Sequence, residues 1–153
     1  MEGMVTFVVG GPREPGSAPW RVLAGAALTG GAVGFGDVRL PPHMAGPNLH
    51  VHTREDEASY IISGVLTVVV GDRTFEAGPE TLVWLPRGLP HTFANRGDKE
   101  VRCIGVTSPA GIEAMFEEQA AYFASLQGPP DHSYLAELGA RFGVSVVGPP
   151  LDV

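Results

Sequence analysis

The stretch His50-Val-His-Thr-Arg-Glu-Asp-Glu57 and a later one, Pro86-Arg-Gly-Leu-Pro-His91-Thr-Phe-Ala-Asn95, decide how this chain is interpreted. Three of its five histidines lie in these two stretches, at positions 50, 52 and 91. Side chains two residues apart on a β-strand point to the same face and lie roughly 6.6 Å apart along the strand. His50 and His52 can therefore converge on one point if their segment is extended, and a metal ion is the simplest reason for that placement.

Length and charge limit the number of domains and the kinds of binding partner that we expect for this chain. The chain has 153 residues and a mass of 16.1 kDa, enough for one domain with its own core. Its formal net charge of −7 argues against nucleic acid or an anionic membrane as a partner, since both require clustered positive charge. The N-terminus lacks the pattern of a signal peptide, and no apolar run is long enough to span a bilayer, so we expect a cytoplasmic protein. The single cysteine, Cys103, is expected to fill the core.

The first two-thirds of the chain predict a mainly β fold, a sandwich or small antiparallel barrel. Short β-branched and aromatic runs alternate there with turns rich in Gly, Pro, Asp and Asn, a pattern typical of such folds. The expected strands are residues 4–9, 20–28, 32–40, 48–53, 58–63, 65–70, 74–77, 81–85, 91–95 and 101–107.

After Pro109 the apolar residues recur with a helical period. Helices are predicted over 111–126 and 133–142, with Gly143 ending the second, and an extended tail over 144–151. We therefore expect a barrel core over 1–109 and a helical extension over 110–153 packed on it, within a single domain.

The histidine-containing strands also predict the donor atoms of a site. If His50 and His52 face inward, a turn brings Glu57 to the start of the next strand, and His91 comes from a separate strand. Three imidazoles and a carboxylate suit a divalent first-row metal: iron, manganese, nickel, cobalt, copper or zinc. Glu55 is a rival oxygen donor, but it belongs to the turn and is expected to be solvated.

These two segments resemble the paired motifs of the cupin superfamily, in particular its single-domain, quercetinase-like bacterial members. His50-x-His52, four residues, Glu57, six residues and Gly64 match the first motif. The second is matched by Pro86-x-Gly88, two residues, His91, three residues and Asn95. The leading glycines depart from the pattern: Gly46 lies three rather than five residues before His50, and Gly78 seven rather than five before Pro86.

The resemblance implies a double-stranded β-helix (jelly roll) with C-terminal helices. It also implies one divalent metal held by His50, His52, Glu57 and His91, turns at Gly64 and Gly88, and a structural role for Asn95 at a strand end. Cupin barrels commonly pair through an N-terminal strand, so a homodimer formed through residues 4–9 is expected.

For function, the resemblance implies a metal-dependent enzyme, foremost a dioxygenase acting on an apolar or aromatic oxygenated small molecule. In that reaction Glu57 is the catalytic residue, which either stays on the metal or leaves it to take a proton. A metal-assisted isomerase or cyclase and a non-catalytic ligand-binding cupin remain open as alternatives. Candidate pocket residues are Phe35, Ile61, Phe93, Trp84, Met115 and Phe116, although core packing explains Trp84, and packing of the helix on the sheet explains Met115 and Phe116, equally well.

Overall fold

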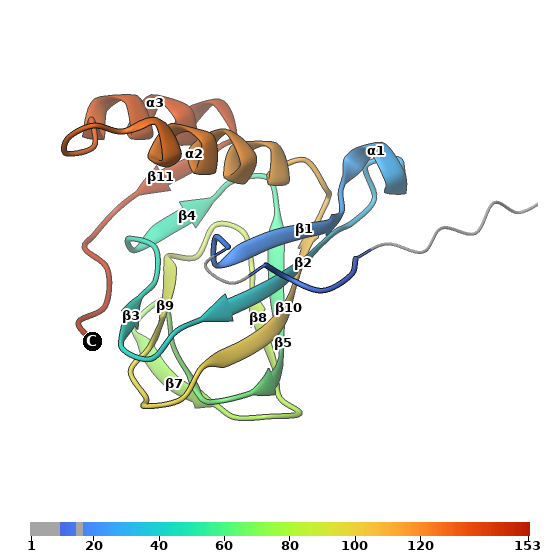
Figure 1. The fold of residues 1–153 in the computed structure, drawn as a ribbon, viewed down its shortest axis with the longest axis vertical. Helices are drawn as coiled ribbons and strands as arrows, with labels where there is room; N and C mark the ends of the chain where they lie inside the picture. Colours follow the sequence, from blue (N-terminus) through green and yellow to red (C-terminus); the bar gives the residue numbers. More distant parts are fainter. Residues whose placement is uncertain (1–9, 15–16) are drawn as a thin grey trace, which may run out of the picture.

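Two antiparallel sheets face each other and close into a small barrel in the computed structural model, which describes residues 10–14 and 17–153 (Figure 1). The five-stranded sheet contains, in spatial order, β1 (Trp20–Ala24), β2 (Gly34–Leu40), β10 (Val101–Ser108), β5 (Asp56–Ser63) and β8 (Leu82–Leu85). The other contains β11 (Val144–Val146), β4 (His50–His52), β9 (His91–Asn95), β6 (Leu66–Val70) and β7 (Arg73–Ala77), and β3 (Met44–Ala45) pairs with β9. The mainly β, double-stranded β-helix class predicted from the sequence is confirmed.

Most predicted strands lie within one or two residues of the observed ones, and the strand over 91–95 matches exactly. The prediction of one strand over 20–28 is wrong in its second half. The β1–β2 register is irregular between Val22 and Ala24, and the short helix α1 (Ala26–Thr29) follows, ending at Gly30 with φ 65°. The predicted strand over 4–9 lies outside the described residues.

Two helices follow the last barrel strand, α2 (Glu113–Ser125) and α3 (His132–Arg141). Asp131 caps α3, since its side chain accepts hydrogen bonds from the backbone N–H groups of Ser133 and Tyr134. Gly143, at φ 76°, redirects the chain into β11, as the sequence predicted. Figure 1 shows both helices together beyond β4 and β11, so they cover the end of the barrel at which these strands lie.

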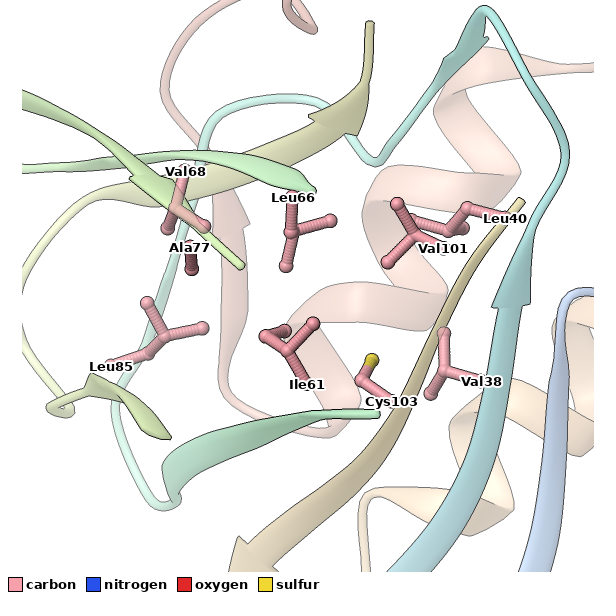
Figure 2. Packing of buried hydrophobic residues seen from close by; sticks show 9 residues of the cluster. All are labelled: Val38, Leu40, Ile61, Leu66, Val68, Ala77, Leu85, Val101 and Cys103. Atoms are coloured by element: carbon pink, nitrogen blue, oxygen red, sulfur yellow. The ribbon is translucent and has the colours of Figure 1, made fainter. Parts of the chain in front are cut away.

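The opposite end of the barrel holds the main apolar core (Figure 2). Buried residues alternate with more exposed ones along β10, and Cys103 is among the buried residues as expected. Each buried Val, Leu or Ile side chain of this cluster contributes roughly 1.5–3 kcal/mol through burial, so this end provides much of the stability of the barrel. The cluster comprises Val38, Leu40, Ile61, Leu66, Val68, Ala77, Leu85, Val101 and Cys103.

A second, smaller core joins the helices to the barrel. Ile112, Met115 of α2, Leu138 of α3 and Val144 of β11 are buried against one another. Val144 is also the register partner of His52 on the neighbouring antiparallel strand, so this cluster lies beside one of the predicted metal ligands on the same face of the sheet. Among the described residues, no helix is long and apolar enough to cross a membrane.

Candidate metal centre

The two sheets bring His50, His52, Glu57 and His91 together inside the barrel. One ligand atom from each of these four side chains lies within 4.8 Å of the others. β4 supplies His50 and His52 on one face, and β9 places His91 opposite His50 in register. Glu57 reaches the cluster from β5 of the other sheet. The grouping expected from the two sequence motifs is therefore present in three dimensions.

Backbone carbonyl groups orient two of the imidazoles. Nδ1 of His50 lies 2.7 Å from the carbonyl oxygen of Asn48, and Nδ1 of His91 lies 3.0 Å from that of Leu89. A carbonyl oxygen can only accept, so each Nδ1 must donate a proton. The lone pair of a neutral ring is then at Nε2, which is the arrangement that second-shell groups impose on metal-binding histidines.

Glu55 has a role that the sequence did not reveal. It was expected to be a solvated turn residue, but it is only 5% exposed, and its Oε2 lies 3.5 Å from Nδ1 of His52. That expectation is wrong, because the turn folds Glu55 back against the imidazole. Carboxylates behind metal-bound histidines orient the ring and raise its basicity. Glu55 is therefore placed to support His52 rather than to replace Glu57.

The electrostatics favour the protonation states that metal ligands require. Burial, together with the neighbouring His91, lowers the pKa of His50 from 6.5 to about 4, so this imidazole is neutral at pH 7. Burial opposes ionisation of Glu57. The imidazole of His91, whose Nε2 lies 3.3 Å from Oε2 of Glu57, together with the imidazoles of His52 and His50, outweighs that effect and holds the pKa of Glu57 below its usual value. The centre thus offers a neutral imidazole at His50 and an ionised carboxylate at Glu57.

The cluster contains polar atoms that the described residues do not satisfy. Nε2 of His52 and Nε2 of His91 are buried without a hydrogen-bond partner there. Leaving such groups unpaired in a protein interior costs about 1–3 kcal/mol each. A divalent cation would take up these lone pairs, and a set of three nitrogens and one oxygen suits first-row transition metals. The residues therefore fit a metal ion.

Two predicted pocket residues point away from the barrel interior. Phe35 is 38% exposed and Trp84 is 55% exposed. Phe35 lies between Gly34 and Gly36, which are buried and face inward, so alternation turns its ring outward. Trp84 lies outward in the same way, between the inward positions Val83 and Leu85.

The other four pocket candidates lie in the two cores. Ile61 belongs to the main core, and Phe93 packs half-buried against it. Met115 lies in the helical core, and Phe116 of α2 packs against that core and against Trp20. The structure therefore does not gather the six predicted residues into one pocket.

Trp20 of β1 is a partly buried residue that packs against the main core from inside the barrel. Its indole ring lies over Gly36 and Gly105, where an added Cβ would collide with it, and 4.8 Å from the ring of Phe116. Its Nε1 is buried with no hydrogen-bond partner in the described part of the chain. The glycines at equivalent positions of neighbouring strands were the available signal, since they leave room for a large ring.

The remaining motif positions have structural roles. Gly64 and Gly88 adopt φ values of 77° and 79°, which an L side chain rarely adopts. The side-chain amide of Asn95 donates to the carbonyl oxygens of Leu40, Pro41 and Lys99, so it ties β9 to two loops.

Comparisons with known proteins agree with this geometry. The family model described as the cupin domain matches residues 36–107, a range that contains all four clustered residues. The comparison with curated proteins gives no match.

Several solved structures share the fold. An RmlC-like cupin family protein with a double-stranded β-helix fold from Methanocaldococcus jannaschii is 18% identical with a TM-score of 0.58, over 71% of this chain and 94% of that one. KdgF from a Halomonas species is 17% identical at a TM-score of 0.55, over 62% and 81%. A sugar phosphate isomerase of the cupin superfamily from Silicibacter pomeroyi is 25% identical at a TM-score of 0.51, over 59% of each chain. The two motifs, the barrel and the family match together identify a cupin domain over residues 36–107 of this chain.

Proposed function

We propose that this protein is a metal-dependent enzyme, a dioxygenase that acts on an apolar or aromatic small molecule bearing oxygen substituents. The observation that carries the proposal is the buried cluster of three histidines and Glu57, with unpartnered Nε2 atoms directed into a largely apolar barrel. The bound metal would supply a Lewis acid and a redox centre at that point.

The residues around the cluster support an uncharged substrate. The inner faces of β2, β5 and β10 beside Glu57 carry no Arg or Lys among the described residues. These faces carry small and weakly polar groups instead, and the indole of Trp20 lies over Gly36 and Gly105. A phosphate or a dicarboxylate would find no cationic side chain on these faces, whereas an aromatic ring that bears hydroxyl groups would contact small and apolar groups. These inward positions are Gly34, Gly36, Ser59, Gly105 and Thr107.

Glu57 is the residue we assign to proton transfer. It is ionised at pH 7 and lies inside the cluster, with its Oε2 3.3 Å from Nε2 of His91. A carboxylate in this state accepts a proton from a substrate hydroxyl group and holds it during the reaction. Nε1 of Trp20 is a free donor on the same interior surface, available to a substrate oxygen. α2 and α3 would exclude water, because they cover this end of the barrel.

Oxygen consumption tests the proposal. Protein loaded with iron, nickel or manganese should consume oxygen with a flavonol or another enediol substrate, and Glu57→Gln should lower kcat by about 100-fold or more. His43→Gln is the matched control, since this exposed histidine pairs with Asp98 away from the cluster. Oxygen-independent turnover of the same substrates would instead contradict the dioxygenase assignment.

A metal-assisted isomerase is the second candidate, favoured by the structural likeness to a sugar phosphate isomerase. It predicts turnover in the absence of oxygen, with the metal polarising a carbonyl group. A non-catalytic ligand-binding protein predicts tight binding, no turnover and unchanged affinity in Glu57→Gln. The interior without Arg or Lys on β2, β5 and β10 argues against a phosphorylated substrate in either case.

The expected homodimer and cytoplasmic location stay predictions, as does the division of the chain at residue 109. The proposed pairing segment, residues 4–9, lies outside the described residues. Sedimentation equilibrium of the full chain and of a chain lacking residues 1–9 tests it: the first should have twice the monomer mass and the second the monomer mass.

A further inference from the structure

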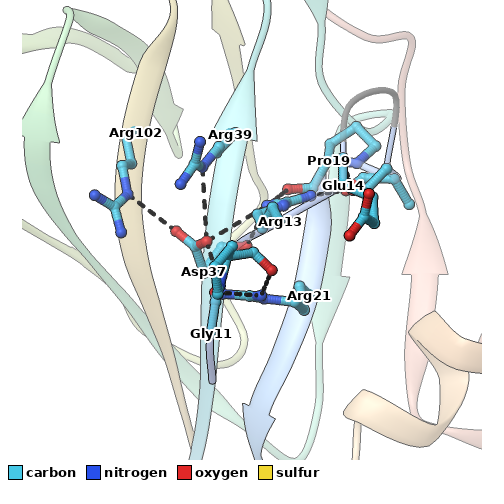
Figure 3. A network of polar contacts seen from close by, with 11 residues as sticks. Gly11, Arg13, Glu14, Pro19, Arg21, Asp37, Arg39 and Arg102 are labelled. Atoms are coloured by element: carbon cyan, nitrogen blue, oxygen red, sulfur yellow. Dashed lines mark hydrogen bonds and ion pairs between the residues drawn. The ribbon is translucent and has the colours of Figure 1, made fainter. Parts of the chain in front are cut away.

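A group of four arginines surrounds one buried carboxylate on the outer face of the five-stranded sheet (Figure 3). Asp37 of β2 is 1% exposed, and its two oxygens are the shared partners of all four guanidinium groups. The nitrogen–oxygen distances are 3.7 Å for Arg13, 3.3 Å for Arg21, 3.6 Å for Arg39 and 3.2 Å for Arg102. One negative charge thus faces four positive ones, in a protein whose overall formal charge is −7.

Two of these arginines have a structural role. Arg13 donates to the carbonyl oxygens of Pro19, Ala18 and Asp37, and Arg21 donates to those of Gly11 and Pro12. They fix the segment before β1 to the sheet. Their guanidinium groups are therefore largely used by the protein itself.

Arg39 and Arg102 have no comparable use. They are direct register partners on the antiparallel strands β2 and β10, a position in which like charges are destabilising. Within the described residues, the side chain of each makes ion pairs or hydrogen bonds with Asp37 alone, through Nε. Nε of Arg39 is buried without a hydrogen-bond partner, and the side chains as a whole are 36% and 40% exposed. Both terminal Nη pairs are consequently left to bind something else.

We propose that Arg39 and Arg102 form a binding site for a phosphate group, free or as a phosphate ester, on the outer face of the barrel. Arginine stays protonated and presents parallel N–H donors that match oxyanions in a bidentate way. A doubly charged phosphate would offset the excess charge around Asp37 and accept hydrogen bonds from both side chains. The site is distinct from the metal centre, since Asp37, Arg39 and Arg102 lie on the outer face and Glu57 points into the barrel.

Calorimetric titration of the full chain with inorganic phosphate, at constant ionic strength set with chloride, tests this site. We expect one phosphate per chain, with affinity lowered at least 10-fold in Arg39→Gln and in Arg102→Gln. Phosphate at about 100 times its Kd should raise Tm by roughly 5 to 10 °C. Arg73→Gln is the matched control, because Arg73 lies over Phe75 on β7, on the other sheet, and should leave the affinity unchanged.

Three results would overturn the proposal. The first is an equal rise of Tm in wild type and in the Arg39→Gln, Arg102→Gln double variant, since this would show general screening. The second is binding of malonate without binding of phosphate, which would assign the site to carboxylates. The third is absence of heat and of any Tm shift in a wild-type protein that folds normally. Circular dichroism in phosphate-free buffer establishes whether the variants fold. We expect that they do, because each substitution removes the repulsion between the two arginines.

Discussion

The two ends of the barrel interior are built from the same alternating strands but hold opposite chemistry. One end is filled by nine apolar side chains in contact, and the other holds three imidazoles and a carboxylate, with buried nitrogens that no described residue satisfies. β5 contributes to both, since Ile61 lies in the apolar end and Glu57 in the polar end. The apolar end stabilises the fold. The unsatisfied buried nitrogens of the polar end lower the stability of the fold, but they are the atoms that can bind a metal.

The largest expected effect is at the apolar end. Ile61→Ala removes a side chain that is 0% exposed, so the free energy of unfolding should fall by about 2–5 kcal/mol through lost burial and a residual cavity. Urea denaturation measures it. Ile62→Ala is the matched control, because Ile62 is 40% exposed on the other face of β5, and the substitution should cost less than about 1 kcal/mol. Similar losses in both variants would mean that the packed end is not where we place it.

The polar end should make the metal-free protein sensitive to acid. Because burial lowers the pKa of His50 to about 4 from 6.5, the unfolded chain binds a proton at this residue before the folded one does. Above about pH 6.5, His50 is neutral in both the folded and the unfolded chain, and the free energy of unfolding does not depend on it. As the pH falls from there toward 4, the unfolded chain takes up the proton first, and the free energy of unfolding decreases by roughly 3 kcal/mol in total.

Urea denaturation in the presence of a chelator, at several pH values, measures this slope. His50→Gln should flatten it, and His43→Gln should leave it as in wild type, since His43 is exposed. A slope that is unchanged by His50→Gln would assign the acid sensitivity to another group.

Many of the residues at the two ends could be placed from the sequence, and the residues that were misplaced have physical causes. The ligands were predictable because a strand places residues 50 and 52 on one face, and the motif spacings placed Glu57 and His91 beside them. Phe35 was misplaced because its neighbours Gly34 and Gly36 carry no side chain, so the alternation gave no sign of which face is buried. Trp84 was misplaced because both faces of β8 are apolar.

Glu55 shows a different reason for failure. Its neighbours Thr53, Arg54 and Asp56 are typical of a solvated turn, and composition alone predicts exposure. Its burial follows from a tertiary requirement instead, since the turn places Oε2 of Glu55 3.5 Å from the buried Nδ1 of His52. Such a requirement becomes visible only after the position of His52 is known.

A smaller effect is expected at Glu55, since it acts on the metal through His52. Glu55→Gln should weaken metal affinity by about 10- to 100-fold, because the amide orients His52 without raising its basicity. Competition with a chromogenic chelator measures the affinity. Glu117→Gln, at an exposed position of α2, is the matched control and should change nothing. Equal affinity in Glu55→Gln and wild type would remove Glu55 from the account of the centre.

The most direct test of the central claim is the metal content of purified protein, measured by inductively coupled plasma mass spectrometry after reconstitution and desalting. Wild type and His43→Ala should each retain about one divalent transition metal per chain, and His91→Ala should retain almost none while keeping the β-sheet signature in circular dichroism. His91 is the variant of choice because it is fully buried, contacts Glu57 and has an unpartnered Nε2. Equal metal content in all three proteins would contradict the assignment of His50, His52, Glu57 and His91 as a metal centre.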